Sequence, residues 1–163
     1  MVATATQAQQ LLNKLCNDFK AYTFKESGNF VWSSPTKCVH HPVIRSQEDI
    51  WSLLHEIAHA ELNHHIYGLD IELLQQEVAA WQLATHLAPR YDLLIDCDYI
   101  EEHLDTYRQW LHRRSLCPDC QQNGFQTTQN TYSCSNCRCL WRVNDARLCG
   151  LQRVRLPNQN RSL

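Results

Sequence analysis

The sequence predicts an α+β protein in which a mostly helical domain with a small β-sheet precedes a short, cysteine-rich β-hairpin module. Before residue 115, four segments repeat apolar residues at helical spacing. After that point the periodicity is lost, and two C-x-x-C pairs enclose a stretch of β-forming residues. We therefore predict two domains, residues 1–115 and 116–163.

Composition predicts a globular protein of the cytoplasm. Hydrophobic residues make up 44% of the chain, yet no apolar run approaches the roughly 18–20 residues of a membrane span. The first ten residues lack the basic start and the apolar segment of a signal peptide. In a reducing compartment, nine cysteines that include two C-x-x-C pairs favour metal binding over disulfides. We expect no membrane partner.

The N-terminal part predicts one helix and two strands. Residues 6–20 place leucines and a phenylalanine along one helical face. Residues 28–45 carry aromatic and β-branched residues interrupted by Ser-Ser-Pro, which is typical of two short strands around a turn.

Three further helices follow. The second begins after Ser46, with Asp49 completing an imperfect capping box, and is expected to run to about residue 67, where Gly68 can end it. Asp70 is expected to cap the third helix, and the fourth covers about residues 99–114.

The second helix carries the pattern His-Glu-x-x-His. His55 and His59 are four residues apart, or about 400° of rotation, so both rings project from nearly the same face and can reach one zinc ion at about 2.0–2.1 Å. Glu56 lies about 100° from His55 and can act as a general base beside the metal. The rest of the helix is apolar, where unpartnered histidines would be costly. We therefore predict a catalytic zinc site.

The third zinc ligand has several candidates. His65 lies ten residues after His55, as in the metzincin pattern, but Leu62 stands at the required glycine and Met1 is the only methionine for the methionine turn. We exclude His65 on these grounds and place His64 with it at the surface, near the helix end.

Glu77 is a second candidate, because it lies on the next helix, 18 residues after His59 and past a turn, among small apolar residues that permit close helix packing. A more distant histidine, His86 or His103, is the third candidate, and His103 could alternatively serve as an oxyanion donor.

The stretch LLHEIAHAELNH followed by EVAAWQLATHLAP resembles the ImmA/IrrE family of small zinc metallopeptidases. In that family the histidine helix precedes a helix of the form E-x-x-A-x-x-F-A-x-x-L-x-x-P. This chain differs in having Ala58 in place of glycine and Trp81 in place of Asn or Asp. The second motif reads here as Glu77, Ala80, Leu83 for Phe, Ala84, Leu87 and, one residue early, Pro89.

The resemblance covers about residues 28–90 and implies a zincin-like metallopeptidase domain. It implies His55 and His59 as the first two zinc ligands, Glu77 as the third and Glu56 as the general base. It also implies a protein or peptide substrate, with cleavage of a regulatory protein.

The two cysteine pairs predict a second, structural zinc site. Cys117 and Cys120 precede Cys134 and Cys137, and four thiolates can surround one zinc ion at about 2.3 Å. The intervening GFQTTQNTYS is typical of a hairpin, and LWRV of a returning strand, so residues 116–163 resemble a zinc ribbon with a basic C-terminal tail. Cys139 is an alternative to Cys137 as the fourth ligand.

Charge differs along the chain. Residues 1–112 contain seven Lys or Arg against fifteen Asp or Glu, whereas residues 113–163 contain eight Arg against two Asp. With Phe125 and Trp141 nearby, the arginines make nucleic acid a candidate partner, beside a protein partner or a solvated surface. They are Arg138, Arg142, Arg147, Arg153 and Arg155.

The sequence thus predicts a zinc metalloendopeptidase with one catalytic and one structural zinc. One alternative is a SprT-like protease acting on DNA-bound proteins, a family that also joins an H-E-x-x-H helix to a zinc ribbon but takes a later histidine as third ligand. Another is a non-catalytic zinc-ribbon adaptor for nucleic acid or protein, although an inactive domain would have no need of Glu56.

Overall fold

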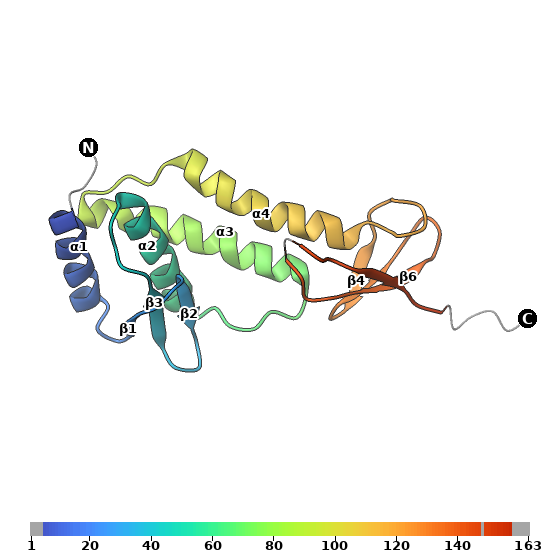
Figure 1. Cartoon of the computed structure of the whole chain (residues 1–163), viewed down its shortest axis with the longest axis horizontal. Helices are drawn as coiled ribbons and strands as arrows, with labels where there is room; N and C mark the ends of the chain where they lie inside the picture. The colour runs from blue at the N-terminus through green and yellow to red at the C-terminus, as the bar shows by residue number, and fades with distance from the viewer. Residues whose placement is uncertain (1–4, 148, 158–163) are drawn as a thin grey trace, which may run out of the picture. The chain divides into compact units, whose positions relative to one another are not determined.

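A computed structural model describes residues 5–147 and 149–157 (Figure 1). The chain folds into two compact units: unit one extends to Ile66 and includes Gln76–Ile100, and unit two comprises Tyr67–Gln75 and the residues from Glu101 onward. In this described part there are four α-helices and two small sheets, which confirms the α+β class. No helix within residues 5–147 and 149–157 combines the length and apolarity needed to cross a membrane.

Helices α1 (Ala5–Asp18) and α2 (Gln47–Glu61) provide much of the core of unit one. The capping box predicted for α2 is complete: Ser46 Oγ accepts from the Asp49 N–H at 3.2 Å, and the Asp49 carboxylate accepts from the Ser46 N–H at 2.9 Å. Aspartate therefore serves here where glutamate is usual.

The predicted extension of α2 to residue 67 is wrong. The helix ends at Glu61, with Leu62 as C-cap, and Asn63 follows in the left-handed region with φ 53°. Asparagine tolerates this conformation, so Asn63 ends the helix in the way expected of Gly68. The chain therefore turns back immediately before His64.

Unit one also contains a three-stranded sheet in the order β1-β3-β2 (Figure 1). The two predicted strands are β2 (Val31–Ser33) and β3 (Cys38–His41), which pair antiparallel. A third strand, β1 (Thr23–Glu26), pairs parallel with β3 and escaped prediction because its mostly exposed side chains lack a clear apolar alternation. Strand β2 lies at the edge of the sheet and contacts α2.

Helices α3 (Asp70–Leu87) and α4 (Cys97–Ser115) each contribute residues to both units, and a short 3-10 helix, η1 (Ala88–Tyr91), follows α3. The predicted capping role of Asp70 is not observed, because its carboxylate accepts bonds from Arg114 and Tyr132. The Glu72 carboxylate instead accepts from the backbone N–H groups before the helix, those of Gly68 at 2.7 Å and Leu69 at 3.0 Å.

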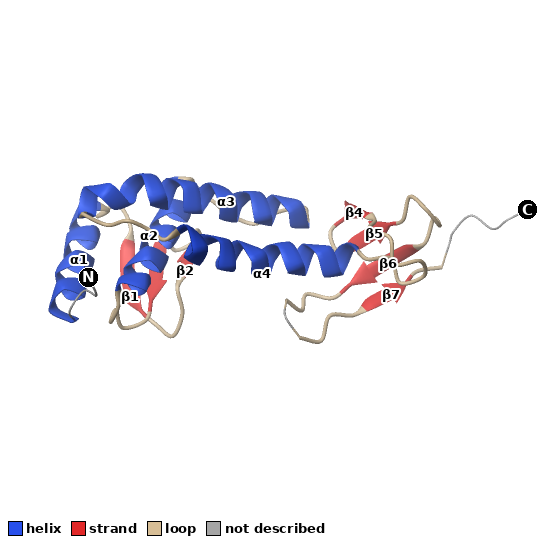
Figure 2. Cartoon of the chain, turned by 90° about the horizontal axis from the view of Figure 1, so that it is seen from above, coloured by secondary structure: helices blue, strands red, loops and turns tan. Residues whose placement is uncertain are grey.

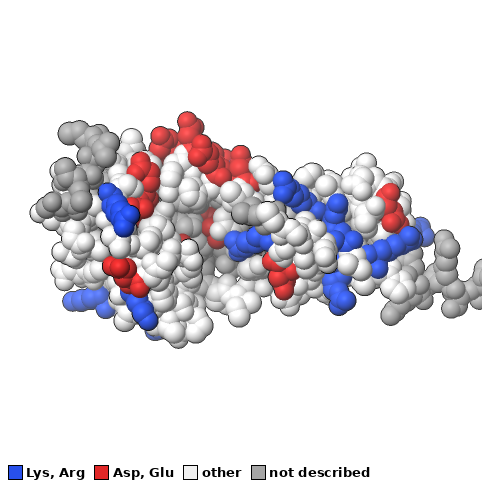
Figure 3. All heavy atoms as spheres, in the orientation of Figure 1, with Lys and Arg blue, Asp and Glu red and all other residues white. Residues whose placement is uncertain are grey.

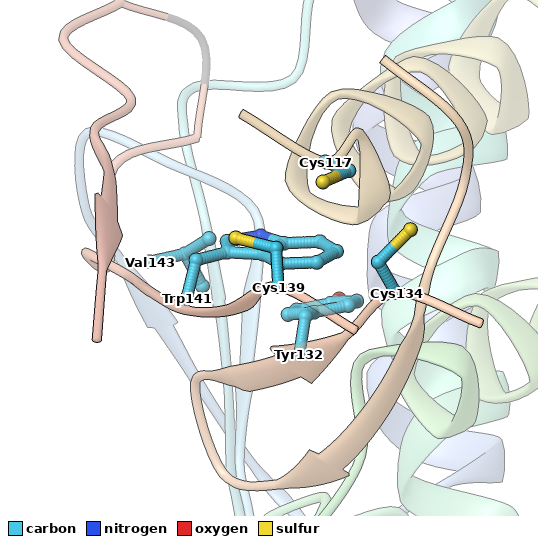
Figure 4. Packing of buried hydrophobic residues seen from close by; sticks show 6 residues of the cluster. All are labelled: Cys117, Tyr132, Cys134, Cys139, Trp141 and Val143. Atoms are coloured by element: carbon cyan, nitrogen blue, oxygen red, sulfur yellow. The ribbon is translucent and has the colours of Figure 1, made fainter. Parts of the chain in front are cut away.

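Unit two contains an antiparallel sheet in the order β4-β5-β6-β7 (Figure 2). The predicted hairpin and returning strand are confirmed as its first three strands, and β7 is additional. Their bounds are Phe125–Thr128, Thr131–Ser133, Leu140–Val143 and Arg153–Arg155. Tyr132 and Trp141 stack at 5.6 Å in a small core that also contains buried cysteines (Figure 4).

A buried polar network supports this small core. The Arg114 guanidinium donates to Asp70 at 2.5 Å, to Asn130 at 2.6 Å and to the Asn144 carbonyl at 2.6 Å. Tyr132 also donates to Asp70, at 2.5 Å. The buried cation thus has a buried anion and further acceptors, which is the condition under which a charge is tolerated inside a protein.

Candidate metal centres

The first cluster lies in unit one and consists of His55, His59 and Glu77, which are all buried. Helix periodicity brings the two histidines of α2 together, with 3.0 Å between their Nε2 atoms. Glu77 on α3 approaches with Oε2 at 3.1 Å from His55 Nε2 and Oε1 at 3.6 Å from His59 Nε2. The structure therefore brings together the three residues predicted as ligands.

These separations fit a metal ion. Four ligands around a tetrahedral zinc, each bonded at about 2.0–2.1 Å, are separated from one another by about 3.3 Å. The observed 3.0, 3.1 and 3.6 Å surround that value. Two imidazole nitrogens and a carboxylate that converge on one point concentrate lone pairs, which a divalent cation would balance. The group could hold a metal ion.

The protonation of Glu77 agrees with this. Burial alone would raise the pKa of its carboxyl, but hydrogen bonds and charge from His55 and His59 lower it to about 2. The carboxylate is thus ionised at neutral pH, as a ligand must be.

The alternative third ligands lie outside this cluster. Among the described residues, none of His65, His86 and His103 belongs to it. His65 is exposed, and its Nδ1 contacts the Asn63 carbonyl at 3.1 Å.

Glu56, the predicted general base, follows His55 in the sequence, and its side chain is half-buried. Its Oε2 accepts a hydrogen bond from the backbone N–H of Trp32 on β2, at 2.6 Å. Burial raises the pKa of Glu56 to about 7, against the lowering effects of His59 and the Trp32 N–H. A carboxyl with a pKa near the working pH can both take and return a proton.

His64 is a functional candidate that the sequence reasoning missed. The sequence predicts a surface position for His64, but the residue is half-buried, and its Nδ1 lies 2.8 Å from His59 Nδ1. Burial, and to a smaller extent the charge of the neighbouring His59, lowers the pKa of His64 to about 4. The left-handed Asn63 produces this contact, since it turns the chain back toward α2.

Aromatic side chains pack against His55 of the first cluster. Trp81 stacks on its ring at 4.2 Å with 24° between the planes. Tyr99 contacts Trp81 edge-on at 5.8 Å and Trp51 at 5.1 Å. Trp81, which differs from the Asn or Asp of the family pattern, therefore restricts the orientation of a proposed ligand ring.

The second cluster lies in unit two and consists of Cys117, Cys120, Cys134 and Cys137. Two pairs of sulfur atoms, Cys117–Cys137 and Cys120–Cys134, are each 3.5 Å apart. A disulfide requires about 2.0 Å, whereas four sulfurs bonded to zinc at about 2.3 Å are separated by about 3.8 Å. The cluster therefore has the spacing of a metal site.

The two C-x-x-C turns share one backbone geometry. Gln121 and Arg138 each follow the first cysteine of a pair by four residues, and both adopt the left-handed region. Each donates its N–H to the carbonyl of that cysteine, at 3.0 Å. The repetition directs both sulfurs of each turn toward the same point.

The structure distinguishes Cys137 from Cys139 as the fourth member of the cysteine cluster. The cluster contains Cys137, whereas Cys139 is buried in the core of unit two, with its Sγ 3.7 Å from the Leu140 carbonyl.

No protein-family model matches the chain, and no curated protein or solved structure shows significant similarity to it.

Proposed function

We propose that the protein is a zinc-dependent peptidase whose catalytic metal is held by His55, His59 and Glu77. The observation that carries this proposal is the convergence of two Nε2 atoms and one carboxylate, from α2 and α3, with separations of 3.0 to 3.6 Å. Three protein ligands leave one coordination position open, which distinguishes a catalytic zinc site from a structural one.

Zinc in such a site supplies Lewis acidity toward a peptide carbonyl and lowers the pKa of a water molecule to about 7. Glu56 accepts the proton of the attacking water on its carboxylate and passes it to the leaving amine. The pKa of about 7 for Glu56 in the metal-free chain supports this role.

The four-cysteine cluster is proposed to hold a structural zinc, in a module of zinc-ribbon type. Four thiolates leave no position open for a substrate. A short sheet with so small a core gains stability from a bound metal. The paired C-x-x-C turns and the hairpin that they enclose support this assignment.

The grouping of Glu77 with His55 and His59 supports a Glu-liganded peptidase over a SprT-like protease. A SprT-like protease would take a later histidine as its third ligand. A substrate that is a regulatory protein, as the ImmA/IrrE resemblance implies, is part of the proposal.

Zinc content and peptide hydrolysis test the proposal together. Zinc per chain is measured for the wild type, Glu77→Gln and Glu56→Gln, and hydrolysis is followed on a quenched-fluorescence peptide library. We expect two zincs in the wild type, one in Glu77→Gln under mild chelation, and two without hydrolysis in Glu56→Gln. Unchanged zinc affinity in Glu77→Gln would contradict the ligand assignment. A zinc-loaded wild type that cleaves no peptide of the library and no denatured protein would contradict the activity.

A further inference from the structure

His64 is held beside His59 by three contacts. Its Nδ1 lies 2.8 Å from His59 Nδ1, and its backbone N–H donates to the His59 carbonyl at 2.9 Å. Its own carbonyl accepts from Trp32 Nε1 at 3.0 Å. The two imidazole rings meet edge to face at 4.9 Å. The ring of His64 is thus fixed by backbone contacts as well as by the pairing of the nitrogens.

The direction of the hydrogen bond follows from the chemistry of His59. Only one of two facing Nδ1 atoms can carry the shared hydrogen. His59 directs Nε2 into the proposed metal site, and a metal-binding nitrogen carries no hydrogen. The hydrogen of His59 therefore lies on Nδ1, and Nδ1 of His64 is the acceptor.

We propose that His64 is a positioning residue of the metal centre, which fixes the tautomer and the ring orientation of His59 by accepting its Nδ1–H. This inference rests on the proposed function. Ligating histidines usually donate to a carboxylate, a backbone carbonyl or water, and loss of that acceptor typically weakens metal binding about 10–100-fold. A neutral imidazole acceptor adds no negative charge next to the ligand.

The test compares three variants of the full chain. In His64→Asn, Oδ1 occupies nearly the place of Nδ1 and can accept the same hydrogen, whereas His64→Leu removes the acceptor. His65→Leu is the matched control, because the neighbouring ring of His65 is exposed and its Nδ1 contacts the Asn63 carbonyl. Zinc affinity is measured by competition with a chromogenic chelator, which resolves the two zincs as separate steps.

We expect His64→Leu to weaken one of the two zincs about 10–100-fold. His64→Asn should stay within a few-fold of the wild type, and His65→Leu should be unchanged. Long-range ¹H–¹⁵N NMR spectra should show His59 protonated on Nδ1 in the zinc-loaded wild type and in His64→Asn.

Equal zinc affinity in His64→Leu and His65→Leu would overturn the inference. So would a zinc-loaded wild type in which Nδ1 of His59 carries no hydrogen, a readout that remains decisive if His64→Leu fails to fold. Failure of the proposed function gives a different result, because the wild type itself would then bind no zinc through His55, His59 and Glu77, or would bind it and hydrolyse no peptide. Neither result depends on the difference between His64→Leu and His65→Leu.

A second, independent observation concerns the outer face of the sheet in unit two. Tyr132 and Trp141 point into the core, so their strand neighbours point to the opposite face. Arg142 lies on that outer face, directly opposite Val154 on β7. Phe125 lies on the same face, because it pairs with Ser133, the neighbour of Tyr132. Phe125 and Val154 are 57% and 54% exposed.

Arg142 gives this face a cationic group, within a module whose net charge is positive. Residues 116–157 contain five arginines against two aspartates. Arg147 lies over aromatic rings and Arg153 donates to the Leu116 carbonyl. The exposed guanidinium groups of Arg138 and Arg142, by contrast, make no hydrogen bond or ion pair within residues 5–147 and 149–157. Figure 3 shows basic side chains gathered over this part of the chain.

We propose that this outer face binds single-stranded nucleic acid. Arg142 would contact a phosphate, and the exposed ring of Phe125 would stack on an unpaired base. The combination of positive charge with an exposed aromatic ring favours this occupant over duplex, whose bases are not free to stack on a side chain.

Fluorescence anisotropy of the full chain with labelled oligo-dT and oligo-rU at moderate salt tests the proposal, with a duplex as comparison. Phe125→Ala and Arg142→Ala should each weaken single-strand binding several-fold. Arg142→Ala should also reduce the slope of log affinity against log salt by about 0.7. Arg108→Ala, on α4, should have no effect. No binding, or binding that neither variant changes, would overturn it, and a stronger affinity for duplex would do the same.

Discussion

The backbone N–H of Trp32 donates a 2.6 Å hydrogen bond to Oε2 of Glu56, so edge strand β2 fixes one oxygen of the proposed catalytic base. The indole Nε1 of the same residue donates to the carbonyl of His64, which contacts His59. A single strand residue therefore holds both the proposed base and the proposed positioning residue. The strand and the end of α2 must consequently keep their relative position for the site to work.

The raised pKa of Glu56 predicts that its buried carboxylate lowers the free energy of unfolding, and does so more at high pH than at low pH. Burial raises its pKa from 4.5 to about 7, so between these pH values the folded metal-free chain binds more protons than the unfolded one. Its free energy of unfolding therefore falls as pH rises through this window. Glu56→Gln has no such titration and should be more stable than the wild type at pH 8, by about 1–3 kcal/mol.

Urea unfolding of chelator-treated wild type and Glu56→Gln, at pH 5 and pH 8, measures this effect. The advantage of the variant at pH 8 should shrink toward pH 5, where the wild-type carboxyl is protonated. An advantage of the same size at both pH values would show that ionisation of Glu56 is not its cause.

The buried ion pair of Asp70 and Arg114 predicts a large loss of stability when one partner is removed. Asp70→Ala leaves the guanidinium of Arg114 buried without its anion, so the free energy of unfolding should fall by about 3–5 kcal/mol. Arg108→Ala is the control, because its pairs with Glu101 and Asp105 are exposed and screened by solvent, so their loss should change the free energy of unfolding little. Equal losses in the two variants, measured by chemical denaturation, would contradict the role of the buried network.

Gly124 lies against the core of unit two, so a larger residue at this position is predicted to clash with its neighbours. A Cβ atom built there would lie 2.4 Å from the Ser133 carbonyl oxygen and 2.4 Å from the Trp141 ring. Gly124→Ala should therefore destabilise the fold by about 1–3 kcal/mol. Gly28→Ala, where a Cβ meets nothing within 4 Å, should be nearly neutral. Thermal unfolding of both variants is the measurement, and a harmless Gly124→Ala would show that β4 can move away.

The grouping of the candidate ligands in two clusters could largely be predicted because most of its determinants are local. The spacing of His55 and His59 follows from the helical repeat, and that of the cysteine pairs from a tight turn. Predicting Glu77 also required a choice between candidate residues beyond α2. The resemblance to the family motif supplied that choice. His64 could not be placed correctly because its position depends on where α2 ends, and Asn63 ended it five residues before the expected glycine.

Tertiary contacts overrode local signals elsewhere. Asp70 stands at a helix start, where aspartate usually caps, yet a buried arginine distant in sequence binds its carboxylate. Strand β1 exists because β3 offers it a parallel partner, and nothing in Thr23–Glu26 alone indicates that pairing. Likewise, the contact of Trp32 with Glu56 joins positions 24 residues apart through a main-chain group that carries no sequence signal.

The position of Cys139 outside the thiolate cluster predicts different outcomes for two neighbouring cysteines. Cys137→Ser removes a proposed zinc ligand and should release the structural zinc at low chelator concentration, with exposure of the three remaining thiols. Cys139→Ser replaces a buried thiol that contacts the Leu140 carbonyl, so the zinc should stay bound. A serine hydroxyl can keep that contact, and the cost should be limited to about 1–2 kcal/mol for burying a more polar group. Zinc content and the rate of thiol modification by a disulfide reagent distinguish the two variants. Zinc loss in Cys139→Ser with retention in Cys137→Ser would contradict this assignment and would make Cys139 the zinc ligand in place of Cys137.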